Sequence, residues 1–185
     1  MSRADAARRI LEAAIGLGTA SGASALSMQG VAGAAGVSKA LVLYHYQSKA
    51  ALLTALLTAL GERSASRLHA AARSDAPQAA WRALVSAECS SRELALLAAL
   101  SLEPNVAPAQ VEAAQEDRAA GATALVVRLL ATFGLEPRIP APFAGRLLLR
   151  ELDALVVAAA RIAPAADALA AEQDVMLLAL LALGR

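Results

Sequence analysis

Residues 27–49 read SMQGVAGAAGVSKALVLYHYQSK, and this stretch decides the fold of the N-terminal part of the chain. Ser27 can cap a first short helix that runs to Ala35. Gly36 then supplies the backbone freedom for a tight turn, and Ser38 can cap a second helix. Two short helices joined by a glycine-bearing turn are typical of a helix-turn-helix, which we therefore predict here.

The second of these helices carries side chains suited to DNA. Its first turn exposes Lys39 and Ala40, where recognition helices usually meet base edges. Tyr44 and His45 at its far end can donate hydrogen bonds to phosphate oxygens. The candidate DNA contacts of the whole stretch are Ser27, Gln29, Ser38, Lys39, Ala40, Leu41, Tyr44, His45, Ser48 and Lys49.

Phosphate binding is also expected just after this helix. Ser48 can cap a long following helix, whose free N–H groups would attract an anion, and Lys49 is adjacent. Both lysines and both tyrosines of the chain lie within residues 39–49. The alternative interpretation is that Val42 and Tyr46 lie in the core while the other side chains form a solvated face. We accept this interpretation only for Val42 and Tyr46, which lie one turn apart and are assigned to the core.

Charge is distributed unevenly along a nearly neutral chain of net charge +1. Residues 1–50 hold five basic and two acidic side chains, and residues 13–61 contain no carboxylate. An acid-free basic end can attract phosphates, although chance asymmetry would explain the charge alone equally well.

The rest of the sequence predicts an all-α fold of about nine helices, because Ala and Leu dominate and turn signals divide the chain into helix-sized segments. Leucines repeat on one helical face in residues 52–60 and again in residues 148–155. A last helix at about residues 168–183 is apolar nearly all round, so its own core or a second subunit must cover it. No apolar run reaches the ~20 residues that a membrane span needs.

Residues 8–53 resemble the N-terminal domain of the tetracycline-repressor (TetR-type) regulators. The matching elements, in order, are Ile10-Leu11, Ala13-Ala14, Gly22, Ser27-Met28, Val31-Ala32, Ala35-Gly36-Val37-Ser38, Tyr44-His45-Tyr46 and Ser48-Lys49. The chain departs from the family pattern at Gly18 and Ala23, where aromatic residues are frequent, and at Leu26, Gln47 and Ala50.

The resemblance implies a homodimeric, cytoplasmic transcriptional regulator without a cofactor. Residues 1–47 would form the three-helix DNA-binding domain, and residues 48–185 a helical domain for effector binding and dimerisation. The last two long helices would form the dimer interface. By family default the protein would be a repressor, released from a palindromic operator on double-stranded DNA by a small molecule.

The composition of the second domain predicts an apolar, largely aliphatic effector, since Leu, Ala and Val dominate it. Candidate contacts are Trp81, Glu88, Cys89, Gln115, Arg128 and Arg150. The pattern favours exposed or paired surface groups over ligand contacts for each polar member of this set. Cys89 is expected to be an inert, buried thiol.

Two other function classes fit the sequence less well. An enzyme is disfavoured: the glycines of residues 16–22 have the wrong spacing for a dinucleotide fingerprint, His69 and Cys89 have no evident catalytic partner, and no metal-ligand cluster appears. A helical partner-binding or structural protein would explain the helices but not the acid-free segment.

Overall fold

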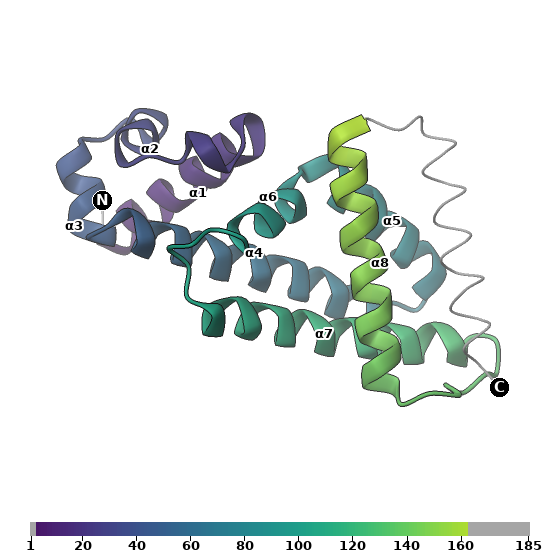
Figure 1. Ribbon diagram of the computed structural model, residues 1–185. Coiled ribbons are helices and arrows are strands. Elements are labelled where there is room, and N and C mark those ends of the chain that lie inside the picture. Colours follow the sequence, from purple (N-terminus) through teal and green to yellow (C-terminus); the bar gives the residue numbers. More distant parts are fainter. Residues whose placement is uncertain (1–2, 163–185) are drawn as a thin grey trace.

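The computed structural model describes residues 3–162, which form eight α-helices and one short 3₁₀ helix (Figure 1). These are α1 (Arg3–Ser21), η1 (Ala23–Ala25), α2 (Met28–Ala35), α3 (Lys39–Tyr46), α4 (Lys49–Ala72), α5 (Pro77–Ser91), α6 (Glu93–Leu100), α7 (Pro108–Ala131) and α8 (Ala141–Ile162). The all-α prediction is confirmed. The predicted helix at residues 168–183 lies outside the described residues.

Helices α1, α2 and α3 gather at one end of the molecule, and we call them the head (Figure 1). Their apolar residues face one another: Ile10 of α1, Val31 of α2 and Val42 of α3 are each fully buried. Burial of one apolar stripe per helix holds these short segments together, since isolated helices of this length are unstable in water.

Helix α4 starts in the head and runs the length of the molecule, with α7 alongside it (Figure 1). Its predicted leucine stripe is buried, confirming the pattern: Leu52, Leu53, Leu56, Leu57 and Leu60. Small residues let the two backbones approach closely. A Cβ added at Gly61 would lie 2.9 Å from the Ala114 Cβ, and one added at Gly121 would lie 2.9 Å from the Leu68 Cβ.

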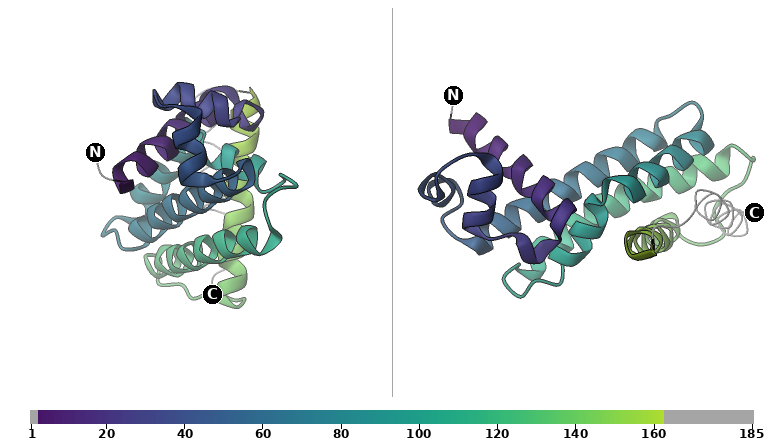
Figure 2. Two further views of the ribbon diagram at one scale, coloured as in Figure 1. Left: turned by 90° about the vertical axis from the view of Figure 1, so that its left-hand side faces the viewer. Right: turned by 90° about the horizontal axis from the view of Figure 1, so that it is seen from above.

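Helix α8 crosses α7 steeply, as the view from above in Figure 2 shows. The crossing point is Gly145, whose Cα faces Thr123 so closely that no side chain fits there. Helices α5 and α6 pack against α4 and α8 on the other side. No helix within residues 3–162 combines the length and apolarity that crossing a bilayer requires.

The boundary between α5 and α6 at Arg92 has no signal in the sequence. Arg92 adopts a left-handed conformation (φ 58°) although it is not a glycine. Its guanidinium donates to the Ala160 carbonyl oxygen of α8 over 3.1 Å. The residue at this turn thus contacts a helix that lies 68 residues further along the chain.

Candidate nucleic-acid interface

Three serines, Ser27, Ser38 and Ser48, cap the starts of α2, α3 and α4 as the sequence predicts. Ser27 Oγ accepts from the Gly30 N–H (3.0 Å), and Ser38 Oγ accepts from the Leu41 N–H (3.1 Å). Gly36, between these helices, is left-handed with φ 62°. The helix-turn-helix therefore rests on local hydrogen bonds that satisfy otherwise free helix-end groups.

One face of α3 is exposed to solvent. Lys39, Ala40, Leu43 and Tyr44 are all exposed, with 59% of Tyr44 accessible. Their spacing places them on one side of the helix. Leu43 was not among the predicted contacts, because a leucine in a helical pattern is usually assigned to the core.

The opposite face of α3 is anchored to the head. Val42 is fully buried, and Leu41, a predicted DNA contact, is half-buried and packs against the core. The Tyr46 hydroxyl donates to the Ala7 carbonyl oxygen of α1 (2.9 Å). Burial raises the pKa of Tyr46 above its usual range. Val42 thus lies in the core as predicted, whereas Tyr46 is half-buried; together they fix the orientation of α3.

Tyr44 is held from two sides at the end of α3. The Arg3 guanidinium lies 5.1 Å from the centre of the Tyr44 ring, in a cation–π contact. The His45 ring meets Tyr44 edge-on, with 5.2 Å between ring centres. Arg3, Tyr44 and His45 therefore gather positive charge and hydroxyl and imidazole donors at one spot, which suits a phosphate.

The start of α4 lies directly after α3. Ser48 Oγ accepts from the Ala51 N–H (3.1 Å), and Lys49 is exposed. At the start of α2, Gln29 is exposed beside the Ser27 cap. The predicted contacts thus lie at the N-terminal ends of α2 and α4 and along α3.

Comparison with known proteins bears directly on this surface. Residues 10–56 match the family described as bacterial regulatory proteins, tetR family. The chain carries a TetR-type DNA-binding domain. The matched residues run from α1 into α4 and include the whole helix-turn-helix. The chain is therefore a DNA-binding transcriptional regulator, and the predicted resemblance is confirmed.

Solved structures show that the TetR-type fold extends beyond the head. A transcriptional regulator from Rhodococcus sp. Rha1 is 23% identical (TM-score 0.77), covering 96% of this chain and 97% of that chain. A TetR family regulator from Agrobacterium tumefaciens is 19% identical (TM-score 0.75; 96% and 98%). The fatty acid degradation regulator FadR from Bacillus halodurans is 15% identical (TM-score 0.73; 95% and 94%). No curated protein matches the sequence.

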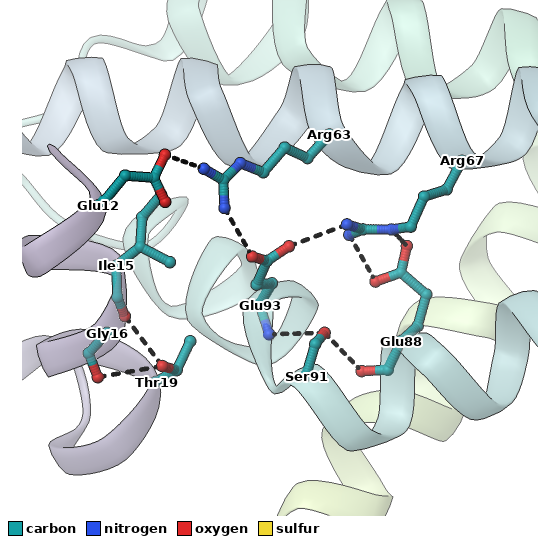
Figure 3. Close-up of polar contacts among 9 residues, drawn as sticks. All are labelled: Glu12, Ile15, Gly16, Thr19, Arg63, Arg67, Glu88, Ser91 and Glu93. Carbon is teal, nitrogen blue, oxygen red and sulfur yellow. Dashed lines mark hydrogen bonds and ion pairs between the residues drawn. The ribbon is translucent and has the colours of Figure 1, made fainter. Parts of the chain in front are cut away.

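A chain of ion pairs joins the TetR-type head to the remaining helices (Figure 3). Arg63 of α4 binds Glu12 of α1 and, over 2.9 Å, Glu93 of α6. Arg67, one turn later, binds Glu93 (2.9 Å) and Glu88 of α5 (3.0 Å). We call these five residues the charge chain.

The two arginines of the charge chain keep their charge firmly. The hydrogen bond to Glu12 raises the pKa of Arg63 most, and burial opposes it less. Burial lowers the pKa of Arg67, but hydrogen bonds and attraction to Glu88 and Glu93 outweigh it, so this pKa is raised as well. Both arginines therefore stay protonated at physiological pH.

The six candidate effector contacts separate into two groups. Gln115, Arg128 and Arg150 line one open groove between α4, α7 and α8, with a volume of about 1300 Å³. Trp81 is fully buried in the core, and its Nε1 has no hydrogen-bond partner in the structure described.

The other two candidates lie away from this groove. Glu88 is fully buried and belongs to the charge chain, whereas the Cys89 thiol is half-buried. Burial, and then the charge of Glu88, raise the pKa of Cys89. Within residues 3–162 no group of His, Cys, Asp or Glu side chains is arranged to hold a metal ion.

Proposed function

We propose that this protein is a dimeric repressor that binds a palindromic operator through α3 and leaves it when a small molecule binds the helices beyond the head. The observation that carries the DNA-binding part is the exposed face of α3. Lys39, Ala40, Leu43 and Tyr44 project from a helix whose other face is fixed by Val42.

Each exposed position has a physical role in this proposal. Lys39 and Ala40 lie in the first turn of α3, which enters the major groove and meets base edges. Leu43 offers an apolar contact to a thymine methyl group. Tyr44 and Lys49 bind phosphates on either side and set the position of the helix.

A dimer would let the protein read two half-sites of B-DNA. A helix as short as α3 reads only a few base pairs, so specificity needs two copies about 34–36 Å apart in successive major grooves. We propose α8 and the segment after it as the dimer interface.

Release by an effector needs a mechanical link between the head and the other helices. The charge chain and the contact of Gly18 with Leu96 of α6 supply one, because both connect α1 to helices outside the head. A ligand that prefers a different α4–α6 arrangement would shift α1 and change the spacing of the two α3 helices. The factor by which the ligand changes the DNA affinity is set by the ratio of the ligand's affinities for the DNA-binding and the released arrangement.

The test is fluorescence anisotropy of a labelled DNA fragment from the gene's own upstream region, titrated with full-length protein at ~50 mM salt, where phosphate contacts are strongest. We expect binding that weakens as salt rises. The matched variants are Lys39→Ala and, as a control, Arg138→Ala, an exposed arginine in the loop between α7 and α8. If the wild-type protein bound no DNA under these conditions, the proposal would be wrong.

A further inference from the structure

The groove between α4, α7 and α8 is lined by two kinds of side chain. Its apolar part includes five alanines (Ala72, Ala119, Ala120, Ala124 and Ala131) together with Val127 and Leu149. Its polar part includes four arginines: Arg73, Arg128, Arg146 and Arg150. Small side chains leave a broad apolar floor, and the arginines provide charge beside it.

Among residues 3–162, no ion pair neutralises these arginines. Arg73 and Arg128 lie at the C-terminal ends of α4 and α7, where the helix dipole partly balances a positive charge. Arg146 and Arg150 lie within α8 and lack that compensation.

Arg146 and Arg150 are also four residues apart on α8, so they share one face and repel each other. A bound anion would remove this repulsion. The nearest acid on α8 that lines the groove, Asp153, is already engaged: Arg118, which is fully buried, donates to both of its carboxylate oxygens.

The other acids of the groove lie towards its far end. Glu112 and Glu116 belong to the first half of α7, and Glu116 is twelve residues before Arg128, or ~18 Å along the helix axis. That separation is about twice the screening length at physiological salt. Glu112 and Glu116 are therefore well separated from Arg128 along α7.

We propose that this groove binds an organic anion with an apolar body, whose charged head is held by Arg146 and Arg150 and whose body lies on the alanine floor. The proposal that this groove is the effector site rests on the proposed function. The proposal that the groove binds an organic anion rests only on the residues that line it. It also revises the apolar effector expected from composition, because a neutral hydrocarbon would leave the arginines unpaired. Arg128 and Gln115 border the same groove and complete it.

The test measures binding to full-length protein, without DNA, by isothermal titration calorimetry. Three probes separate the parts of the ligand: decanoate has both head and apolar body, acetate only the head, and 1-decanol only the body. We expect decanoate to bind more tightly than either of the others. Equal affinity for decanoate and 1-decanol would overturn the proposal.

The matched variant is the double substitution Arg146→Gln and Arg150→Gln, with Arg138→Gln as the control outside the groove. Because charge-assisted hydrogen bonds are lost, decanoate should bind at least about tenfold more weakly to the double variant and unchanged to the control. All of these arginines are exposed, so the variants should fold, which circular dichroism checks. Unchanged affinity of the double variant for decanoate would contradict the proposal.

Two further measurements distinguish this proposal from its alternatives. If the double variant changes the monomer–dimer equilibrium in sedimentation velocity while decanoate affinity stays the same, the groove is an interface between copies and the proposal is wrong. DNA release by decanoate is measured separately by anisotropy. Binding of decanoate without DNA release would support the anion site while contradicting its role as the effector site.

Discussion

Arg67 grips the Glu88 carboxylate with two parallel hydrogen bonds: Nε donates to Oε1 and Nη2 donates to Oε2, each over 3.0 Å. The Glu88 side chain is fully buried, whereas that of Arg67 is 30% exposed. A buried carboxylate is tolerated only when it is paired, so this contact is a condition for packing α5 against α4.

Arg67→Ala should therefore lower the free energy of unfolding by about 3 kcal/mol, since it leaves Glu88 buried without its partner. Glu116→Ala, at an exposed position of α7, should change it by no more than about 0.5 kcal/mol. Urea denaturation followed by circular dichroism measures both. Similar small changes in the free energy of unfolding for the two variants would show that burial of Glu88 does not depend on its pairing with Arg67.

The contact between the head and α6 can be tested at Gly18. A Cβ added there would lie 2.6 Å from Leu96 Cδ2, so Leu96 would have to move. Gly18→Ala should thus destabilise the protein by about 1–2 kcal/mol, the clash exceeding the ~1 kcal/mol gain in helix propensity. In a Leu96→Ala background the same substitution should stabilise by about 1 kcal/mol, because the clash is gone.

Gly16 provides the matched control for this experiment. It lies in the same helix, is exposed, and has no atom near the position of an added Cβ. Gly16→Ala should stabilise the protein by about 1 kcal/mol in both backgrounds. Identical effects at positions 16 and 18 would mean that Leu96 does not couple α6 to the head.

Lys39 and Lys49 should differ in how their loss affects DNA binding. Lys49→Ala should weaken binding to all sequences alike and reduce the slope of log affinity against log salt by about one, as expected for a single phosphate contact. Lys39→Ala should also change which bases are preferred, since this side chain faces base edges. Anisotropy titrations at several salt concentrations, on the upstream fragment and on scrambled DNA, separate the two roles.

Leu43→Ala should reduce discrimination between thymine and other bases without changing the salt slope, because an apolar contact releases no counterions. Selection of binding sites from random DNA with both proteins measures this. An unaltered set of selected sites would place Leu43 outside the interface.

Cys89 should react slowly with iodoacetamide near neutral pH. Burial and the Glu88 charge raise its pKa, so less of the reactive thiolate is present than in a free cysteine. Because folding raises the pKa of Cys89, its protonated thiol contributes to the stability of the folded state. This contribution to the free energy of unfolding is complete below the unfolded-state pKa and is lost as the pH rises through the folded-state pKa. Labelling followed by mass spectrometry, with urea-unfolded protein as the control, checks the rate; equally fast labelling of the folded protein would contradict it.

The sequence by itself determined the head. Ser27, Gly36 and Ser38 act within three or four residues of themselves, by capping a helix end or permitting a left-handed turn, and such local signals can be read without knowing the rest of the fold. The buried faces of α4 and α8 were also predictable, because helical periodicity is a local property. Leu43 was missed since its hydrophobicity matches a core pattern, although only the packing of α3 determines which side is covered.

Only the tertiary structure decided the charge chain and the groove. Glu12 and Arg63 are 51 residues apart, and Arg118 and Asp153 are 35 apart. In a sequence, a charged residue that will be paired is indistinguishable from one that will be solvated, since the pairing depends on how distant helices pack. For the same reason the sequence grouped Glu88 with Arg150 as ligand contacts, whereas the fold commits Glu88 to Arg67 and leaves Arg150 facing an open groove.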